Sequence, residues 1–260
     1  MRIGNKVFSE GTHIMGILNV TPDSFYFKSR VTKDDILKRA EKMIKEGAAI
    51  LDIGAQSTRP GHIPVGPEEE LNRLMEPLCL IRKEFDIPLS VDTYNSEVAM
   101  EALKAGADMI NDIWGLQKDE KMAEVIAKYD AAVCIMHNQN GTEYKDIFKD
   151  IEQFFQSSLA LCKQYGISDD KICLDGGIGF GKTKEQNFEV LYGYDKFLKL
   201  GFPLLLGTSR KSLFGGSVED RLEPTLETTR LAAKMGVLFV RVHDVKENLQ
   251  AIRETLCKSA

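Results

Sequence analysis

Eight short apolar runs along this chain each end at a polar or charged residue. The residues that end or directly follow these runs are Asn19, Asp52, Asp92, Asn111, His137, Asp175, Ser209 and Arg241. A strand that is buried on both faces reads as a continuous apolar run. Because α/β proteins place their chemistry at the carboxyl ends of such strands, the pattern indicates both a parallel sheet and the edge that carries the active site.

Helical patterns alternate with these apolar runs. The first covers residues 33–47, with Ile36, Ala40 and Ile44 on one stripe and a glycine at the end. The others are expected at 68–85, 96–106, 122–129, 146–165, 184–200, 224–235 and 245–258. Strand then helix, eight times, predicts an α/β fold of the (β/α)8 TIM-barrel class, with a single domain over residues 1–260. The alternative is a doubly wound open sheet, which more often has fewer strands and a glycine-rich first turn.

Composition narrows the class of partner. The 260 residues carry a formal net charge of −5, so we expect no nucleic-acid partner, and any anion site must be built locally. The amino terminus lacks an apolar targeting stretch and no run approaches membrane-spanning length, which favours a cytoplasmic protein without a membrane partner. The five cysteines show no Cys-x-x-Cys spacing and predict free thiols.

Three of the strand ends suit recognition of a flat heterocycle. Asp92, Asn111 and Asp175 end the third, fourth and sixth runs and would converge at the mouth of a barrel, with Lys211 nearby. Carboxylates and a carboxamide can pair with ring N–H donors and ring acceptors. The alternative for any one of them is a local cap on backbone N–H groups, and four residues together make that reading weaker.

Basic residues follow the last two runs, where barrel enzymes often bind phosphate. They are Arg210, Lys211, Arg241 and His243. Arg241 and His243 are two residues apart, so at a strand end they point the same way and suit a di-anionic leaving group. The alternative is a structural bridge from Arg241 or His243 to Asp244 or Glu247.

The glycine-rich segment 176–183 matches the P-loop pattern G-x-x-x-x-G-K-[ST]. We interpret the match as a coincidence, because the segment belongs to the sixth strand–helix unit and no metal-holding partner strand is evident. A tight turn that lets Asp175 and Phe180 approach a ligand explains the glycines equally well.

Two long connections, three histidines and Trp114 lie outside these motifs. Segments 19–32 and 54–67 are long for strand-to-helix connections and are expected to be mobile lids. His13 and His62 are expected to be structural, and His137 has no assigned role. Trp114 could stack on a ligand or cover the barrel rim.

Taken together, these motifs resemble those of the dihydropteroate synthase family along almost the whole length of the chain. The resemblance rests on motifs in family order, which are residues 15–25, 52–61, 92–93, 110–112, 136–137, 175–183, 207–212 and 241–245. The family is a (β/α)8 barrel that joins a dihydropterin pyrophosphate to p-aminobenzoate and releases pyrophosphate and 7,8-dihydropteroate. The resemblance therefore implies a transferase of a non-methyl alkyl group in folate biosynthesis, the target class of sulfonamides, and a homodimer.

The resemblance also assigns roles. It implies pterin binding by Asp92, Asn111, Asp175 and Lys211, with Asp92, Asp175 and Lys211 catalytic. It implies pyrophosphate binding by Asn19, Arg241 and His243, with Mg²⁺ at Asn19. It implies that the p-aminobenzoate site is shaped by Phe25, Thr58, Arg59, Pro60, Phe180 and Ser212. In the implied SN1-like path pyrophosphate leaves first, and the anionic Asp175 stabilises the resulting pterin cation.

Departures from the family pattern define two alternatives. Tyr26-Phe27-Lys28-Ser29 replaces the usual Ser-Asp-Gly-Gly of the first loop, so a catalytically silent pterin-binding paralogue is one alternative. Ala55-Gln56 replaces Gly-Glu, Gly176 replaces a proline and Trp114 replaces a small residue. A pterin-dependent methyltransferase domain is the other alternative, which the pyrophosphate and p-aminobenzoate residues disfavour.

Overall fold

The computed structural model describes residues 1–20, 33–56 and 65–257. Its strands are β1 (Arg2–Ile3), β2 (Lys6–Val7), β3 (His13–Asn19), β4 (Ile50–Gly54), β5 (Leu89–Asp92), β6 (Met109–Asp112), β7 (Ala132–Met136), β8 (Ile172–Asp175), β9 (Leu205–Leu206) and β10 (Phe239–Val242). Its α-helices are α1 (Lys33–Glu46), α2 (Pro67–Glu84), α3 (Ser96–Lys104), α4 (Met122–Lys128), α5 (Ile147–Tyr165), α6 (Lys184–Tyr192), α7 (Leu222–Met235) and α8 (Val245–Cys257).

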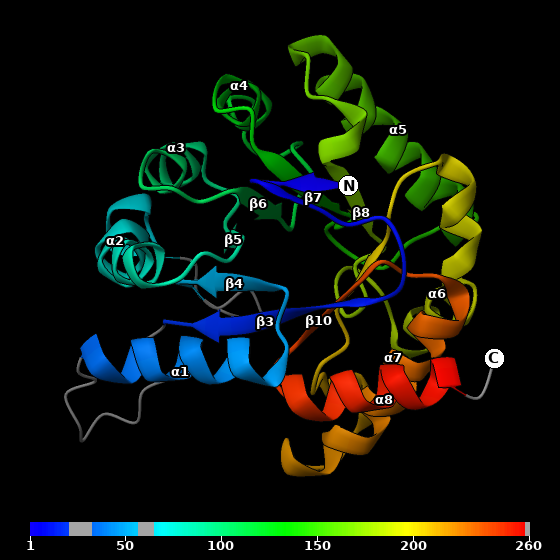
Figure 1. Cartoon of the computed structure of the whole chain (residues 1–260). Helices are drawn as coiled ribbons and strands as arrows, with labels where there is room; N and C mark the ends of the chain where they lie inside the picture. The colour runs from blue at the N-terminus through cyan, green and yellow to red at the C-terminus, as the bar shows by residue number, and fades with distance from the viewer. Residues whose placement is uncertain (21–32, 57–64, 258–260) are drawn as a thin grey trace.

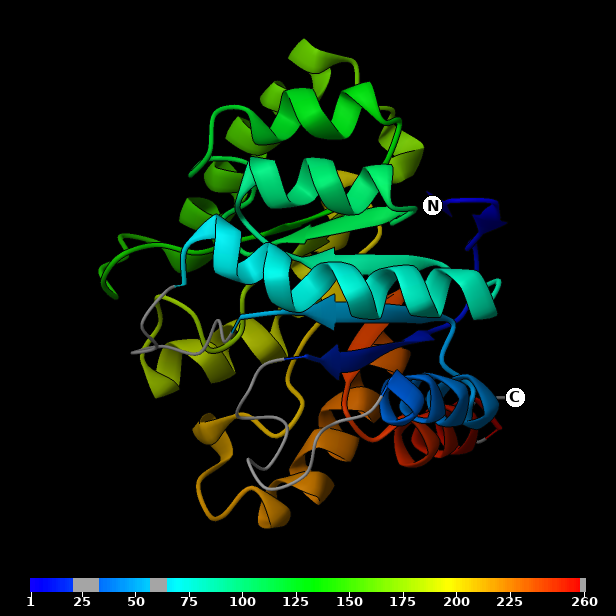
Figure 2. The same cartoon turned by 90° about the vertical axis from the view of Figure 1, so that its left-hand side faces the viewer.

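The main sheet is a parallel barrel. Its eight strands follow the order β8-β7-β6-β5-β4-β3-β10-β9. A single parallel bridge between Leu174 and Leu204 joins the two ends of this order. The helices surround the strands, and the strands run toward one side of the molecule while the amino terminus and the end of α8 lie on the other (Figures 1 and 2). The predicted (β/α)8 class is confirmed.

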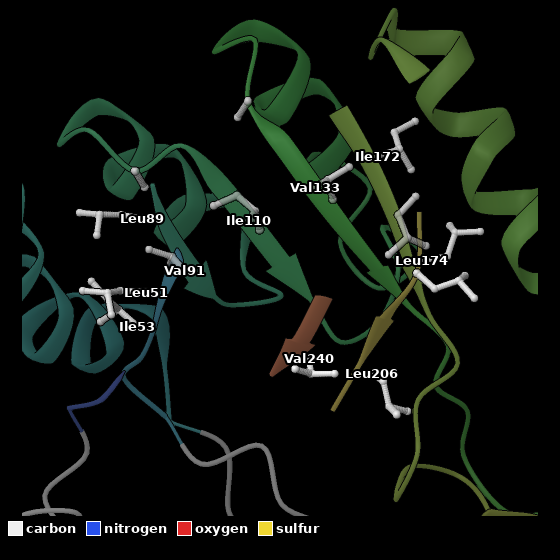
Figure 3. Packing of buried hydrophobic residues seen from close by; sticks show 14 of the residues in the cluster. Leu51, Ile53, Leu89, Val91, Ile110, Val133, Ile172, Leu174, Leu206 and Val240 are labelled. Carbon is white, nitrogen blue, oxygen red and sulfur yellow. The ribbon is translucent and has the colours of Figure 1, made fainter. Parts of the chain in front are cut away.

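The alternation of side chains divides the core into two layers. Residues that face outward belong to the large apolar cluster between the strands and the helices. Figure 3 shows members of this cluster on β4 to β10, among them Leu51, Val91 and Val240. Residues of opposite parity fill the barrel interior. The interior is apolar at the amino ends of the strands, where it contains Met15, Ile50, Met109, Ala132, Cys134, Cys173, Leu205 and Phe239. Two residues further along most strands, the same inward parity brings polar side chains into the barrel.

A hairpin that the sequence pattern did not predict closes the apolar end. β1 and β2 pair antiparallel, and Ile3 and the nearby Phe8 are buried with the apolar interior residues. The rings of Phe8 and Phe239 meet edge to face with centroids 5.2 Å apart. His13 lies here as well, with Nε2 2.9 Å from the carbonyl of Glu10, which supports a structural role at the end opposite the mouth.

The ends of the helices follow local sequence signals. Asp146 caps α5 by accepting from the Lys149 amide, and Gly166 ends it in the left-handed conformation at φ 79°. Thr183 and Gln186 form a reciprocal capping box on α6. The prediction of one helix over 184–200 was wrong, because α6 ends at Tyr192 and a 3₁₀ helix covers Tyr194–Leu200.

The break between these two helices lies at Gly193. A Cβ there would lie 2.7 Å from the tip of the Phe148 ring of α5, so a residue with a side chain at this position would have to displace that ring. All five cysteines are free thiols, as predicted. Within 1–20, 33–56 and 65–257, none of the helices combines the length and apolar character that a membrane crossing needs.

Candidate active site

Polar side chains from successive strands converge inside the carboxyl end of the barrel. Asp52, Asp92, Asn111 and Asp175 are each at most 6% exposed. Each has the inward parity of its strand, two residues beyond an interior position such as Ile50 or Cys173. The prediction that Asp92, Asn111 and Asp175 meet at the mouth is therefore confirmed in geometry, and Asp52 joins them.

Arg241 lies at the centre of one half of this group. Its Nε donates to Asp52 Oδ2 at 2.6 Å, and its Nη2 donates to Asp92 Oδ2 at 2.7 Å. Asn111 Nδ2 makes a longer contact of 3.4 Å to the same Asp52 oxygen. Two hydrogen bonds leave part of the guanidinium fork available to an anion. Arg241 thus pairs with Asp52 and Asp92, and the described residues show no ion pair of Arg241 with Asp244 or Glu247.

The two carboxylates keep one oxygen each for a further donor. Asp52 Oδ1 and Asp92 Oδ1 are buried and have no hydrogen-bond partner among the described residues. Burial raises the pKa of Asp92, and Arg241 opposes that rise. A buried acceptor without a donor costs roughly 1–3 kcal/mol, so a ligand that brings N–H groups into the mouth recovers this cost.

Asp175 forms the second half of the site with a partner that the sequence did not indicate. Its Oδ1 accepts from the Gly177 amide at 2.8 Å and lies 3.0 Å from the Tyr194 hydroxyl, which is buried behind it. Tyr194 Oη also lies 2.5 Å from the Leu205 carbonyl, and its single proton serves one acceptor at a time. Burial raises the pKa of Asp175, and the nearby Lys211 opposes the rise.

Lys211 stands over the same half of the mouth. Its Nζ donates to the Ile178 carbonyl and lies 4.7 Å from the centroid of the Phe180 ring. Burial lowers the pKa of Lys211 to about 8, although Asp175 works in the opposite direction. The sequence-predicted Lys211, Phe180 and Asp175 are therefore neighbours, and the loop after β8 joins them.

The basic residues after β9 and β10 separate into two groups. His243 is oriented by Ser209, whose hydroxyl lies 2.9 Å from Nδ1 and accepts from the His243 amide at 3.1 Å. Arg210 instead forms a two-point ion pair with Asp244, with N–O distances of 2.7 and 2.9 Å. Arg210 is thus engaged structurally, and the expectation that it joins a phosphate site is not met.

Asn19 lies at the rim formed by β3 and β4. Its Oδ1 lies 3.1 Å from the position that a Cβ on Gly54 would take, and Asp92 flanks the same position. Gly54 therefore leaves the space between Asn19 and Asp92 open. No group of three or more His, Cys, Asp or Glu side chains in the described ranges has metal-binding geometry.

Some predicted residues cannot be placed and some have other contacts. Phe25, Thr58, Arg59, Pro60 and His62, with most of the two long loops, lie outside the described residues. Ser212 is exposed at the start of a 3₁₀ helix, Ser212–Phe214.

Trp114 follows β6 on the rim of the barrel. Lys118 Nζ lies 4.7 Å from the centroid of the Trp114 ring and 4.2 Å from that of Tyr94. The backbone amide of Trp114 donates to Asp112, which faces away from the interior and accepts from Leu116 as well. These contacts favour the rim-covering alternative for Trp114.

The glycine-rich segment does not present a phosphate cradle. Lys182, which matches the P-loop lysine, is 9% exposed and its amine contacts protein acceptors. In a P-loop this amine reaches the phosphates of the nucleotide. The interpretation of the match as a coincidence is thereby supported.

Comparisons with known proteins agree with this geometry. A family model described as pterin binding enzyme matches residues 15–243. The chain is 47% identical to a dihydropteroate synthase of Clostridium beijerinckii over 98% of each chain.

Solved structures give the same picture. One is a dihydropteroate synthase from Clostridium difficile in the presence of pteroic acid, with a TM-score of 0.94 and 50% identity over 96% of this chain and 98% of that one. Another is the Xanthomonas albilineans dihydropteroate synthase with 4-aminobenzoic acid, with a TM-score of 0.92 and 33% identity over 96% and 94% of the two chains.

Proposed function

The chain belongs to the pterin-binding enzyme family, and from that premise we propose how its residues carry out the dihydropteroate synthase reaction. That reaction is the function of this enzyme. It transfers the dihydropterin together with its exocyclic methylene from 6-hydroxymethyl-7,8-dihydropterin pyrophosphate to p-aminobenzoate. The products are 7,8-dihydropteroate and pyrophosphate. The observation that carries the residue assignment is the set of buried carboxylates and the carboxamide inside the mouth, flanked by Lys211 and Arg241.

The pterin is proposed to lie against Asp92, Asn111, Asp175 and Lys211. The buried Asp92 Oδ1 lacks a partner among the described residues and would accept from a ring N–H group. Asn111 can both donate and accept, and Lys211 would donate to a ring acceptor. Desolvation inside the barrel strengthens each of these interactions relative to water.

The chemical step is proposed to be SN1-like. Arg241 and His243 would bind the pyrophosphate and stabilise its growing charge as it departs. Asp175, held by Gly177 and Tyr194, would stabilise the positive charge on the pterin. The neutral amine of p-aminobenzoate then attacks the exocyclic methylene, and the nitrogen loses a proton to water after the C–N bond has formed, so a strong general base is not required.

The second substrate is proposed to lie beside Phe180 and Ser212. The ring of Phe180 is already in contact with the Lys211 ammonium, which suits an aromatic carboxylate nearby. Phe25, Thr58, Arg59 and Pro60 complete this proposal from outside the described residues.

Mg²⁺ is proposed as the metal ion, held by Asn19 together with pyrophosphate oxygens. The donor chemistry fits, because Mg²⁺ prefers oxygen ligands and takes few of them from the protein when phosphates are present. When bound, it would neutralise charge on the leaving group. A homodimer, a cytoplasmic location and a single domain over residues 1–260 complete the proposal.

Turnover with product identification tests the proposal. Purified protein with Mg²⁺ and both substrates is expected to form dihydropteroate, identified by mass spectrometry, whereas Lys211→Ala is expected to lose pterin binding. Pterin pyrophosphate binding without turnover would instead indicate the silent paralogue, and binding of an intact folate the methyltransferase alternative. Full pterin binding by Lys211→Ala would contradict the assigned site while leaving the activity established.

A further inference from the structure

The loop between β8 and α6, residues 176–182, contacts both Asp175 and Lys211. The Gly177 amide donates to Asp175, and the Ile178 carbonyl accepts from Lys211. Phe180, two residues further on, places its ring near the same ammonium. A small movement of this backbone would therefore displace three of the proposed substrate contacts together.

The Lys182 side chain is buried beneath this loop and donates hydrogen bonds to its backbone carbonyls. Its Nζ is 3.0 Å from the Gly177 carbonyl and 3.1 Å from the Phe180 carbonyl. These two residues flank Ile178, whose carbonyl contacts Lys211. The third contact of the amine is His137 Nδ1, also at 3.0 Å. Three acceptors match the three donors of an ammonium group.

His137 supplies an anchor that belongs to a different part of the barrel. It directly follows β7, is 2% exposed and packs edge to face against Phe154, with centroids 4.9 Å apart. Burial first, and Lys182 second, lower the pKa of His137 to about 2, so the ring is neutral and can accept at Nδ1. Burial lowers the pKa of Lys182 to about 7, opposed by Asp175.

Close backbone contacts leave the loop little room to shift. A Cβ on Gly177 would lie 1.9 Å from the His137 carbonyl oxygen, and one on Gly181 would lie 2.7 Å from the Gln139 carbonyl oxygen. Both glycines have positive φ, at 68° and 54°. The glycines thus let the loop rest directly on residues 137–139.

We propose that Lys182 and His137 are a positioning pair for Lys211 and Phe180: His137 anchors the Lys182 amine, and the amine fixes the loop that carries the Ile178 carbonyl and the Phe180 ring. Neither residue touches a substrate. The inference rests on the proposed roles of Lys211 and Phe180 in substrate binding. It assigns a role in positioning to His137 and to Lys182, the lysine of the P-loop-like segment, for which no role in phosphate binding is supported.

The test compares Lys182→Met, which keeps the apolar stem and removes the donors, with Lys184→Met, an exposed neighbour, as the matched control. Lys182→Met is expected to lose about 10- to 100-fold in kcat/KM, in line with the cost of a misplaced catalytic group. We expect kcat to fall and KM for both substrates to rise, with thermal unfolding well above the assay temperature. Lys182→Gln, which keeps two N–H donors, should recover part of the loss, and Lys184→Met should match the wild type.

A double-mutant cycle with His137→Leu keeps the inference testable if Lys182→Met folds poorly. The single His137→Leu variant should lose about 3- to 10-fold in kcat/KM, and the double variant little more than Lys182→Met alone, because paired residues are not additive. Wild-type kinetics in either folded single variant, or strict additivity of the two losses, would overturn the inference. Lys211→Ala run in parallel separates this result from an error in the site itself, since retained pterin binding there would contradict the assignment of Lys211.

Discussion

The two halves of the mouth hold their cations in different ways. On the side of β4, β5 and β10, Arg241 pairs directly with Asp52 and Asp92 at 2.6 and 2.7 Å. On the side of β8 and β9, Lys211 is held by a backbone carbonyl of the 176–182 loop and faces the Phe180 ring. The first half is built from strand residues alone, whereas the second depends on how a loop lies.

Because of this difference, substitutions in the two halves of the mouth are expected to act in different ways. Sheet register fixes the first half, because Asp52 pairs with Ser90 across β4 and β5 and Gly54 with Asp92. Substitutions there should act through unpaired buried charge. In the second half the carboxylate of Asp175 is also fixed by a strand, but its cation is not, so substitutions there should act through displacement of Lys211.

Removal of Arg241 is expected to have the largest effect. Arg241→Met leaves the carboxylates of Asp52 and Asp92 buried without their cation, which should cost about 3 kcal/mol in the free energy of unfolding. Activity should fall by roughly 1,000-fold, since the pyrophosphate contact is lost too. Urea unfolding and steady-state kinetics measure the two effects.

The matched control for this prediction is the double variant Arg241→Met with Asp52→Asn. It should regain stability, because one of the two stranded charges is gone, but not activity. Unchanged stability in the single variant would show that the strand-built half is not held by charge.

The pH dependence of the second half is expected to follow Lys211. The pKa of Lys211 is lowered to about 8 by burial, so the ammonium is present below that pH and is lost above it. The value of kcat/KM for the pterin substrate should therefore fall as pH rises through about 8, by about tenfold for each pH unit beyond it.

Lys211→Arg sharpens this test, because arginine does not lose its proton in proteins. The basic limb of the profile should vanish in that variant even if its activity is low. If kcat/KM fell at the same high pH in both proteins, the titrating group would not be Lys211, and the charge of Lys211 would not explain the pH dependence.

The smallest effect is expected at the oriented histidine. Ser209→Ala removes the hydroxyl that contacts His243 Nδ1 at 2.9 Å, and one neutral hydrogen bond is worth about 1 kcal/mol. We expect about a threefold to fivefold loss in kcat with little change in stability. Thr208 has its own partner, Thr228, so Thr208→Ser is a conservative control beside it.

A loss of 100-fold or more in Ser209→Ala would place His243 among the strongly coupled groups of the first half. No loss at all would show that the ring keeps its orientation without Ser209.

The pattern of apolar runs along the chain correctly predicts the positions of side chains that lie at strand ends. The apolar runs ending at Asp92, Asn111 and Asp175 are enough to place these side chains at one mouth, because inward parity and strand direction are local properties. Asp52 also ends an apolar run, but no role in the site was predicted for it, because its partner Arg241 lies 189 residues away along the chain.

Contacts between distant segments were not predictable in this way. Tyr194 contacts Asp175 from the 3₁₀ helix that follows α6, 19 residues along the chain, and no local pattern predicts that contact. The pairing of Lys182 with His137 depends on how two loops pack, and neither residue carries a periodic signal. The hairpin of β1 and β2 is too short to produce one.

The hairpin of β1 and β2 gives the packed interior of the barrel a closed floor at its amino end. Ile3 and Phe8 pack with the apolar interior residues, so a ligand reaches the buried polar side chains from the carboxyl ends of the strands. A molecule that rests on the polar residues just above this floor has to arrive before anything that covers it, and the joined product leaves as one molecule.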